Sequence, residues 1–145
     1  MPRHPLRPAR EQDCAELARL ANQLGYPASI DAMRARLRRL LESSIDAVFV
    51  AEAAGGIVAG WIHGVLSQYL ESDYRVEIAG LVVDERFQRQ GIGRDLVPEV
   101  ERWGARHGAS QSSVRCRTTR PDAHLFYKSL GYSENKTQIV FRKLL

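Results

Sequence analysis

Residues 77–94 read EIAGLVVDERFQRQGIGR, and this stretch decides the fold. Its first part, which ends at Val83, is apolar and rich in β-branched residues, a pattern that predicts a largely buried strand. A basic turn containing Gly91 and Gly93 follows, and beyond it apolar residues recur at helical spacing as far as Trp103. The predicted order is therefore strand, glycine turn, helix.

The turn predicts a binding site for phosphate groups. Between a strand and a helix, successive backbone N–H groups and the positive end of the helix dipole point at one spot. Gly91 and Gly93 carry no Cβ, so a ligand can approach the backbone there. Three arginines, at positions 86, 89 and 94, add positive charge around the turn. A diphosphate fits this arrangement.

Two common phosphate-binding patterns do not fit the turn. A Walker loop needs Gly-Lys-Ser/Thr, which is missing, and a Rossmann fingerprint needs a third glycine where Leu96 stands. The turn instead resembles the pyrophosphate loop of the GNAT acetyltransferases. In that family, glutamine or arginine, two residues, glycine, one residue, and glycine or alanine follow a strand. Gln88, Gly91 and Gly93 occupy these places.

The composition is that of an ordinary globular protein. The 145 residues, 26% of them charged and 44% hydrophobic, suit one domain spanning residues 1–145. No apolar run is long enough to cross a bilayer and no apolar segment follows the basic first residues, so we expect a cytoplasmic protein without membrane contact. The two cysteines, Cys14 and Cys116, are expected to be free thiols, and no metal site is predicted.

The net charge of +4 raises the alternative of a nucleic-acid binder. Much of the excess comes from arginines at 34, 36, 38 and 39 on one candidate helix, where a solvated helix face explains them more simply. Basic and aromatic residues do not alternate as a single-strand binder requires. We therefore expect no nucleic-acid partner.

Apolar periodicity predicts the order of elements along the chain. Strands are expected at 6–8, 47–51, 57–65, 77–83, 112–117 and 137–141, and helices at 11–24, 30–41, 92–107 and 121–130. This order predicts an α/β (α+β) fold, with a mixed, mostly antiparallel central sheet and helices on both faces. It is also the element order of the GNAT fold. Residues 123–132 resemble the C-terminal signature of that family, in which Phe-Tyr precedes Leu-Gly-Tyr.

The resemblance covers essentially the whole chain and implies a single GNAT domain that binds acetyl-CoA. The strand backbone would pair with the pantetheine arm, extending the sheet, and the turn would hold the pyrophosphate. The implied cofactor-binding residues are Leu81, Val82, Val83, Gln88, Arg89, Gln90, Gly91, Ile92, Gly93 and Arg94. Either Val82 or Val83 is expected to offer its N–H to the thioester carbonyl. Arg120 stands where many relatives carry an asparagine that contacts pantetheine, and it could instead reach a phosphate.

Two residues are predicted to be catalytic. Tyr127 falls on the tyrosine of the family signature, whose phenol protonates the departing CoA sulfur, and its alternative is a core position beside Phe126. Glu77 stands eleven residues before Gln88, where several GNAT enzymes carry a glutamate general base. Its alternative is a surface residue at the end of the strand. His124 is expected to be a packing or capping residue. His63 is expected to be a core residue, with a place in the lining of the substrate pocket as its alternative.

The sequence therefore predicts an acetyl-CoA-dependent N-acetyltransferase. A primary amine would attack the thioester directly in a ternary complex, without a covalent enzyme intermediate, because neither cysteine has a visible base nearby. A small-molecule amine is favoured as acceptor, since Glu71, Asp73 and Glu77 form an acidic cluster before the strand. The alternatives are a protein N-terminal or lysine acetyltransferase and a non-catalytic CoA-binding module. A homodimer is compatible with each of these functions.

Overall fold

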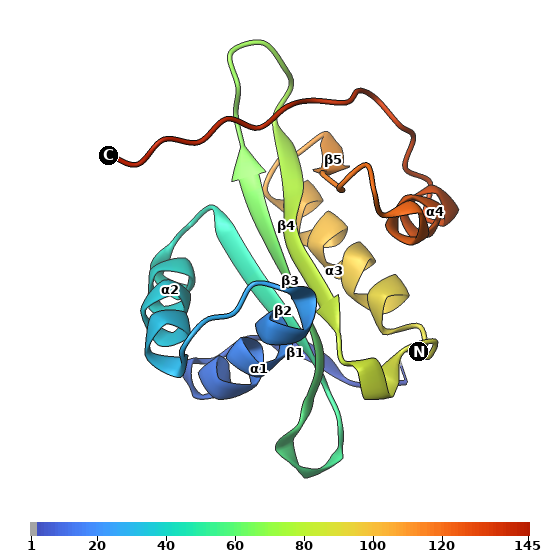
Figure 1. Cartoon of the computed structure of the whole chain (residues 1–145). Helices are drawn as coiled ribbons and strands as arrows, with labels where there is room; N and C mark the ends of the chain where they lie inside the picture. The colour runs from blue at the N-terminus through green and yellow to red at the C-terminus, as the bar shows by residue number, and fades with distance from the viewer. Residues whose placement is uncertain (1–2) are drawn as a thin grey trace. The chain divides into compact units, whose positions relative to one another are not determined.

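The computed structural model describes residues 3–145, which contain one five-stranded sheet in the order β1-β2-β3-β4-β5 (Figure 1). The strands are β1 Leu6–Pro8, β2 Asp46–Glu52, β3 Val58–Ser67, β4 Arg75–Val83 and β5 Gln111–Val114. The first four pair antiparallel with their neighbours, and β5 pairs parallel with β4. The predicted mixed, mostly antiparallel sheet is confirmed.

Four α-helices lie between and after the strands in residues 3–145. They are α1 Cys14–Leu24, α2 Ile30–Glu42, α3 Ile92–Arg106 and α4 Pro121–Ser129. Short 3₁₀ turns lie at Glu11–Asp13, Ala54–Gly56 and Glu85–Phe87. The helix ends follow the expected signals, since the hydroxyl of Ser29 accepts a 3.0 Å hydrogen bond from the N–H of Ala32 and Gly25 closes α1 at a φ of 93°.

The chain divides into two compact units, one ending at Val114 and the other running from Arg115 to Leu145. The first unit holds the whole sheet with α1, α2 and α3, and the second holds α4 and the C-terminal segment. The single domain spanning residues 1–145 stays a prediction.

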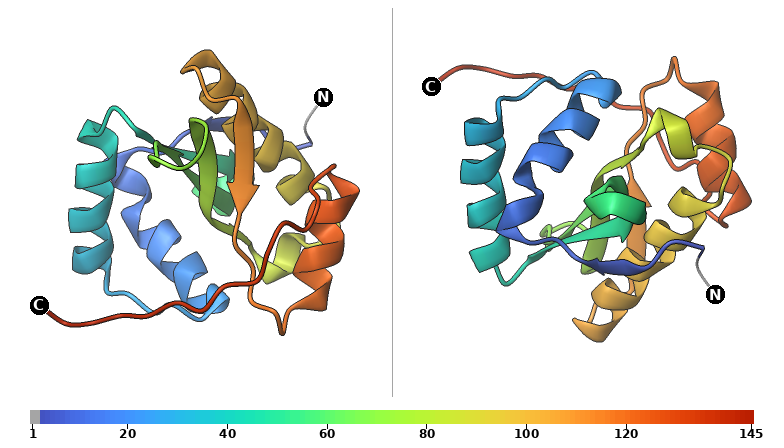
Figure 2. Two further views of the ribbon diagram at one scale, coloured as in Figure 1. Left: turned by 90° about the horizontal axis from the view of Figure 1, so that it is seen from above. Right: turned by 90° about the horizontal axis from the view of Figure 1, so that it is seen from below.

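In the first unit, helices cover both faces of the sheet. Helices α1 and α2 pack on one face and α3 on the other (Figure 2). Under α1 and α2 lies a core of buried aliphatic side chains, among them Leu17, Leu20, Leu37, Val50 and Val82. Burial of such side chains is the main stabilising contribution to this layer.

The opposite face lets α3 approach the sheet closely because glycines line the contact. A Cβ added at Gly64 of β3 would lie 2.6 Å from Cγ1 of Val100 in α3. A Cβ added at Gly104 of α3 would lie 2.6 Å from Cβ of Val76 in β4. No real side chain tolerates such distances, so the spacing between α3 and the sheet depends on these glycines.

The predictions at the C-terminal end of the chain are wrong in two places. Residues 137–141 form no strand with any part of residues 3–145, although Ile139, Val140 and Phe141 favour one. The side chain of Phe141 is 88% exposed. A strand exists only where a neighbouring strand accepts its backbone hydrogen bonds, and this segment has none. Strand β5 likewise ends at Val114 instead of continuing to Arg117. Elsewhere in the chain, β3 extends past its predicted end at residue 65 as far as Ser67.

Candidate active site

The edge of β4 that faces β5 is open beyond Ile78. Pairing between the two strands covers only Arg75–Ile78 and Gln111–Val114. A bulge at Ala79 interrupts the pairing of β4 with β3, since Ile78 lies opposite Gly64 and Gly80 lies opposite His63. Within residues 3–145, the rest of β4 as far as Val83 therefore has a strand partner on one side only.

The direction of each backbone group on this open edge follows from one hydrogen bond. The N–H of Asp84 donates to the carbonyl of Ala59 at 2.8 Å, so Asp84 points its backbone groups toward β3. In an antiparallel pair, the backbone N–H and C=O groups of successive residues point alternately toward and away from the partner strand, so those of Val82 also point toward β3. The carbonyl oxygen of Val82 accordingly lies 2.9 Å from where a Cβ of Gly60 in β3 would be. The N–H groups of Leu81 and Val83 point to the open edge.

The turn after β4 ends at the unobstructed beginning of α3. Arg89 and Gly91 both adopt left-handed conformations, with φ of 63° and 80°. Gly91 is the N-cap of α3 and no side chain in residues 3–145 caps that end, so the N–H groups of Ile92 and Gly93 have no acceptor one turn back within the helix. A Cβ built at Gly91 would meet nothing within 4 Å. An anion is favoured at such a position, because backbone N–H groups and the positive end of the dipole of a long helix meet there.

A buried carboxylate, which the sequence analysis overlooked, holds the start of the turn. Asp84 is completely buried and accepts hydrogen bonds from the guanidinium groups of Arg86 at 2.9 Å and Arg19 at 2.7 Å. It also accepts from the N–H of Arg86 at 3.0 Å. The hydrogen bonds from Arg86, together with Arg19, hold the pKa of Asp84 well below its usual range despite burial. The sequence did contain a signal for this contact. Asp84 directly follows a buried strand, and an aspartate at such a position often accepts a hydrogen bond from the backbone N–H two residues later.

This contact changes the role of one of the three arginines predicted around the turn. The charge of Arg86 is matched by Asp84 inside the protein, so it fixes the turn. The side chains of Arg89 and Arg94 are exposed. Gln88 is also exposed, whereas the side chain of Gln90 is half-buried.

Glu77 lies within β4, and the alternative of a strand-end position is wrong. It is the third residue of the strand and is half-buried. The side chain of Val76 faces α3, where it would meet a Cβ at Gly104, so Glu77 faces the side of the sheet covered by α1 and α2. It lies opposite Val65 and shares this face with His63.

The two histidines named by the sequence analysis each have a protein partner. His63 Nε2 lies 2.7 Å from Oδ1 of Asp46, and the hydroxyl of Ser43 donates to the other oxygen of that carboxylate at 2.7 Å. His124 Nε2 donates to the carbonyl of Arg117 at 2.8 Å and so closes the turn before α4. The contact of His124 fits the predicted capping role, whereas His63 is half-buried and pairs with a carboxylate.

Tyr127 and Arg120 belong to the second unit. Tyr127 is buried on α4, with its ring edge-on to Phe126 and Tyr132 at centroid distances of 5.0 and 5.6 Å. Burial raises the pKa of the phenol, which therefore stays protonated at neutral pH. Arg120 is the exposed N-cap residue of α4, and its guanidinium lies 3.7 Å from the carboxylate of Asp122.

Other kinds of chemistry find little support in residues 3–145. Cys14 and Cys116 are free thiols, and burial raises the pKa of Cys116, which disfavours a reactive thiolate. No group of three or more potential ligand side chains in this range could hold a metal ion. No helix in the same range is long and apolar enough to span a bilayer.

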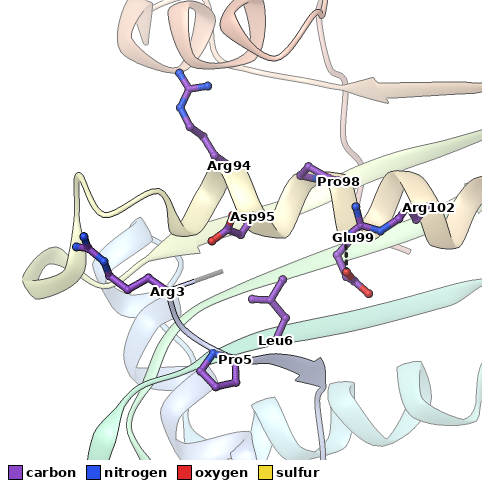
Figure 3. Close-up of a pocket in the computed structure, with 8 residues that line it drawn as sticks. All are labelled: Arg3, Pro5, Leu6, Arg94, Asp95, Pro98, Glu99 and Arg102. Carbon is purple, nitrogen blue, oxygen red and sulfur yellow. Dashed lines mark hydrogen bonds and ion pairs between the residues drawn. The ribbon is translucent and has the colours of Figure 1, made fainter. Parts of the chain in front are cut away.

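An open pocket of about 610 Å³ lies away from the open edge of β4. It is bounded by the segment before β1 and by one side of α3 (Figure 3). Its lining residues are Arg3, Pro5, Leu6, Arg94, Asp95, Pro98, Glu99 and Arg102. Glu99 and Arg102 pair with each other at 2.6 Å, and Arg94 points away from Arg3 and Asp95. The pocket shares only Arg94 with the turn.

Comparison with known proteins identifies the family. A profile described as "Acetyltransferase (GNAT) domain" matches residues 44–134. The chain belongs to the GNAT acetyltransferase family. This GNAT protein is an acetyl-CoA-dependent N-acetyltransferase, and the family, fold class and cosubstrate predicted from the sequence are confirmed.

Several relatives of this GNAT protein carry the same name. An aminoglycoside N(6')-acetyltransferase type 1 of Stenotrophomonas maltophilia is 28% identical over 141 residues, which are 94% of this chain and 91% of the relative. The enzyme of that name from Salmonella typhimurium is 25% identical over 122 residues, 82% of this chain and 83% of the relative.

Solved structures share the GNAT fold. An aminoglycoside N-acetyltransferase in complex with CoA aligns with a TM-score of 0.86 and 23% identity, over 96% of this chain and 93% of that chain. A protein described as a transcriptional regulator from Bacillus halodurans aligns with a TM-score of 0.85 and 21% identity, over 97% of this chain and 99% of that chain. The fold therefore accommodates different functions, and the acceptor must be argued from the site.

Proposed function

We propose that this GNAT enzyme acetylates an amino group of an aminoglycoside, with the 6'-amino group as the preferred position. The proposal is supported by the names of the two curated relatives, each aligned over more than four fifths of both chains. The observation that carries the acetyl transfer itself is the open edge of β4, which leads directly into the beginning of α3, where no side chain of residues 3–145 caps the helix. An extended thioester and its pyrophosphate both find backbone N–H groups along this line.

The proposed cosubstrate contacts follow the chain. The backbone of Leu81 and Val83 binds the pantetheine arm, and an N–H on this edge is offered to the thioester carbonyl. The direction of the ladder favours Val83 over Val82 for that contact. Residues Gln88 to Arg94 bind the pyrophosphate through their N–H groups, with Arg89 and Arg94 supplying charge. Arg120 remains a candidate for a further phosphate contact.

The proposed reaction is a direct transfer. Glu77 takes a proton from the ammonium group, directly or through water, and the resulting amine nitrogen then bonds to the carbonyl carbon. The C–S bond breaks, and the second proton, which the nitrogen loses as the amide forms, replaces the proton that Tyr127 gives up. Tyr127 gives its phenolic proton to the departing sulfur. The raised pKa of Tyr127 supports this role, because a phenol that acts as an acid must be protonated before the reaction.

A polycationic acceptor suits the side of the sheet that Glu77 faces. Glu77 is half-buried there, and Asp46 lies on the same side, where it holds His63. The loop between β3 and β4 adds the exposed carboxylates of Glu71 and Asp73. Carboxylates near a binding site raise the local concentration of a cationic amine.

The deciding experiment follows release of the CoA thiol from acetyl-CoA with a panel of amines. The panel holds an aminoglycoside with a free 6'-amino group, the same compound with that group blocked, a polyamine, and a lysine-containing peptide. We expect turnover with the first compound and its loss on blocking. Turnover with the peptide alone would assign the protein to protein acetylation, and binding of acetyl-CoA without any turnover would support a non-catalytic module.

A matched pair of glycine variants tests the pyrophosphate turn. Gly91→Val should lower the affinity for acetyl-CoA by about tenfold or more, because the side chain strains a φ of 80° and closes the approach to the backbone. Gly25→Val introduces similar strain at a φ of 93°, at the end of α1, and should leave that affinity unchanged. Calorimetry with acetyl-CoA measures both, and equal affinities in the two variants would contradict the assignment.

We further propose a cytoplasmic homodimer. The C-terminal segment exposes large apolar side chains, among them Phe141 at 88% and Leu144 at 93%. An exposed apolar segment of this kind is expected to be buried against a partner. A second copy of the same chain can supply that partner. Sedimentation analysis decides between a dimer and a monomer.

A further inference from the structure

The segment before β1 contacts the centre of the candidate pyrophosphate turn. His4 Nε2 lies 3.0 Å from Oε1 of Gln90, a residue 86 positions further along the chain. The His4 ring also meets the ring of Phe87 edge-on, at a centroid distance of 5.6 Å and an angle of 85°. His4 therefore contacts the residues on both sides of Gln88 and Arg89.

The turn needs support at this point. Gln90 stands between two residues in left-handed conformations, Arg89 at a φ of 63° and Gly91 at 80°. Arg89 is not a glycine, so its conformation costs free energy that contacts elsewhere must offset. The buried Asp84 fixes the beginning of the turn, and the N–H of Asp95, which donates to the carbonyl of Gly91 at 3.0 Å, fixes its end. Within residues 3–145, the hydrogen bond from His4 is the one that reaches the side chain of Gln90 between these points.

His4 is itself attached to the sheet. The carbonyl of the next residue, Pro5, accepts a 2.8 Å hydrogen bond from the N–H of Glu52 at the end of β2. Leu6 then pairs with Ala51 in the β1–β2 ladder. The segment therefore connects the turn to the opposite edge strand of the sheet, and Arg3 and Pro5 line the same side of α3 (Figure 3).

We propose that His4 is a positioning residue that acts through Gln90 and holds the turn in the conformation that binds acetyl-CoA. The inference rests on the proposed function of the turn. In this arrangement His4 Nε2 carries a hydrogen and donates to the amide oxygen of Gln90. A turn that is already ordered loses less conformational entropy when the pyrophosphate binds. His4 thereby stabilises the complex without touching the cosubstrate.

The predicted effect falls on KM for acetyl-CoA and leaves kcat unchanged. His4→Ala should raise this KM by about threefold to tenfold, the range expected for one hydrogen bond. Gln90→Ala should raise the KM for acetyl-CoA by a similar factor. The double variant should have a KM no higher than that of either single variant, because the two residues act as one unit. His4→Gln places an amide donor near the position of Nε2 and should recover part of the affinity.

A second histidine supplies a matched control. His107 at the other end of α3 makes the same kinds of contact: its Nδ1 lies 2.8 Å from the carbonyl of Trp103, and its ring lies 5.1 Å from the ring of that residue. His107→Ala should cost similar thermal stability without changing KM for acetyl-CoA. A shift in KM of equal size in both histidine variants would mean that His4 is merely structural and would overturn the proposal.

The experiment separates this inference from the proposed function. If Gly91→Val weakens acetyl-CoA binding while His4→Ala and Gln90→Ala do not, the turn binds the cosubstrate and only the role of His4 is wrong. If Gly91→Val leaves binding unchanged, the assignment of the turn fails and the role of His4 fails with it. Additive effects in the double variant would also reject the coupling between His4 and Gln90.

Discussion

Contacts with the rest of the chain hold the turn between β4 and α3, whereas no strand pairs with the C-terminal segment at 137–141. The composition of the two segments suggests the opposite. The turn is polar and contains residues in uncommon conformations, yet a buried carboxylate, a hydrogen bond from His4 and a long helix hold it. The C-terminal segment has the composition of a strand, yet its apolar side chains are exposed and nothing in residues 3–145 pairs with it. Local composition predicts the conformation of a segment, whereas contacts with the rest of the chain decide whether it is fixed.

The largest effect is expected when the buried carboxylate that holds the turn is removed. Asp84→Ala should lower the free energy of unfolding by about 3 kcal/mol, because it deletes a completely buried group that holds Arg19 and Arg86. Urea unfolding measures the change. The control is Asp31→Ala, which removes an exposed ion pair with Arg34 at 2.9 Å and should cost less than about 0.5 kcal/mol. Similar losses in the two variants would contradict the anchoring role of Asp84.

The second prediction concerns the other unit and its one proposed catalytic group. Tyr127→Phe should lower kcat by about 100-fold while the KM for acetyl-CoA and the fold are kept, because only the proton for the sulfur is lost. Steady-state kinetics with an aminoglycoside measures the change. Phe126→Leu alters the neighbouring ring and serves as the packing control. A Tyr127→Phe enzyme with full activity would leave Tyr127 as a core residue.

The third prediction sharpens the account of the turn through pH. Arg86 and Arg19 hold the pKa of Asp84 below its usual value, so the ionised form is favoured in the folded protein. The resulting stability is fully present above the unfolded pKa of about 3.9 and is lost as the pH falls from that value through the lower pKa of the folded state. The difference in the free energy of unfolding between the wild type and Asp84→Ala should therefore shrink progressively between about pH 4 and pH 2. A constant difference across that range would mean that Asp84 does not titrate in this way.

The smallest effect is expected in the C-terminal segment. Phe141→Ser should change the free energy of unfolding of the monomer by less than about 0.5 kcal/mol, because the ring is 88% exposed. Chemical denaturation at low protein concentration measures this. The same variant should weaken the proposed dimer. A loss above about 1.5 kcal/mol in the monomer would show that the segment packs as a strand within its own chain.

The sequence predicted most of the fold because periodicity and capping are local signals. The strand at 77–83, the capped helix after Ser29 and the glycine turn before α3 all follow from residues close together in the chain. The strand at 137–141 was wrong because pairing depends on a partner that composition does not reveal. For the same reason the sequence alone did not identify His4, whose contact with Gln90 joins the two ends of a long stretch of chain. The bulge at Ala79 and the open edge after it are also products of strand register.

The roles of the site residues remain predictions of different kinds. The backbone of Leu81 and Val83 is supported by the direction of the ladder, which the sequence had left open between Val82 and Val83. Glu77 keeps its place as the candidate base because it is half-buried inside β4 and faces the sheet side proposed for the amine. A comparison of Glu77→Gln with the wild type, using two amines of different basicity, distinguishes this carboxylate from solvent as the proton acceptor.

The glycines under α3 have a consequence for how the enzyme can change during evolution. In the proposed complex the thioester lies at β4 and the pyrophosphate at the beginning of α3, so the two elements must stay within reach of one acetyl-CoA molecule. Gly60 and Gly64 of β3 keep α3 close to the sheet, because a Cβ at Gly60 would lie 3.1 Å from Cγ2 of Ile92 at the beginning of the helix and a Cβ at Gly64 would lie 2.6 Å from Cγ1 of Val100. Under the proposed function, acceptor specificity can therefore drift through substitutions on the opposite face of the sheet, while a side chain at either of these two positions would displace α3.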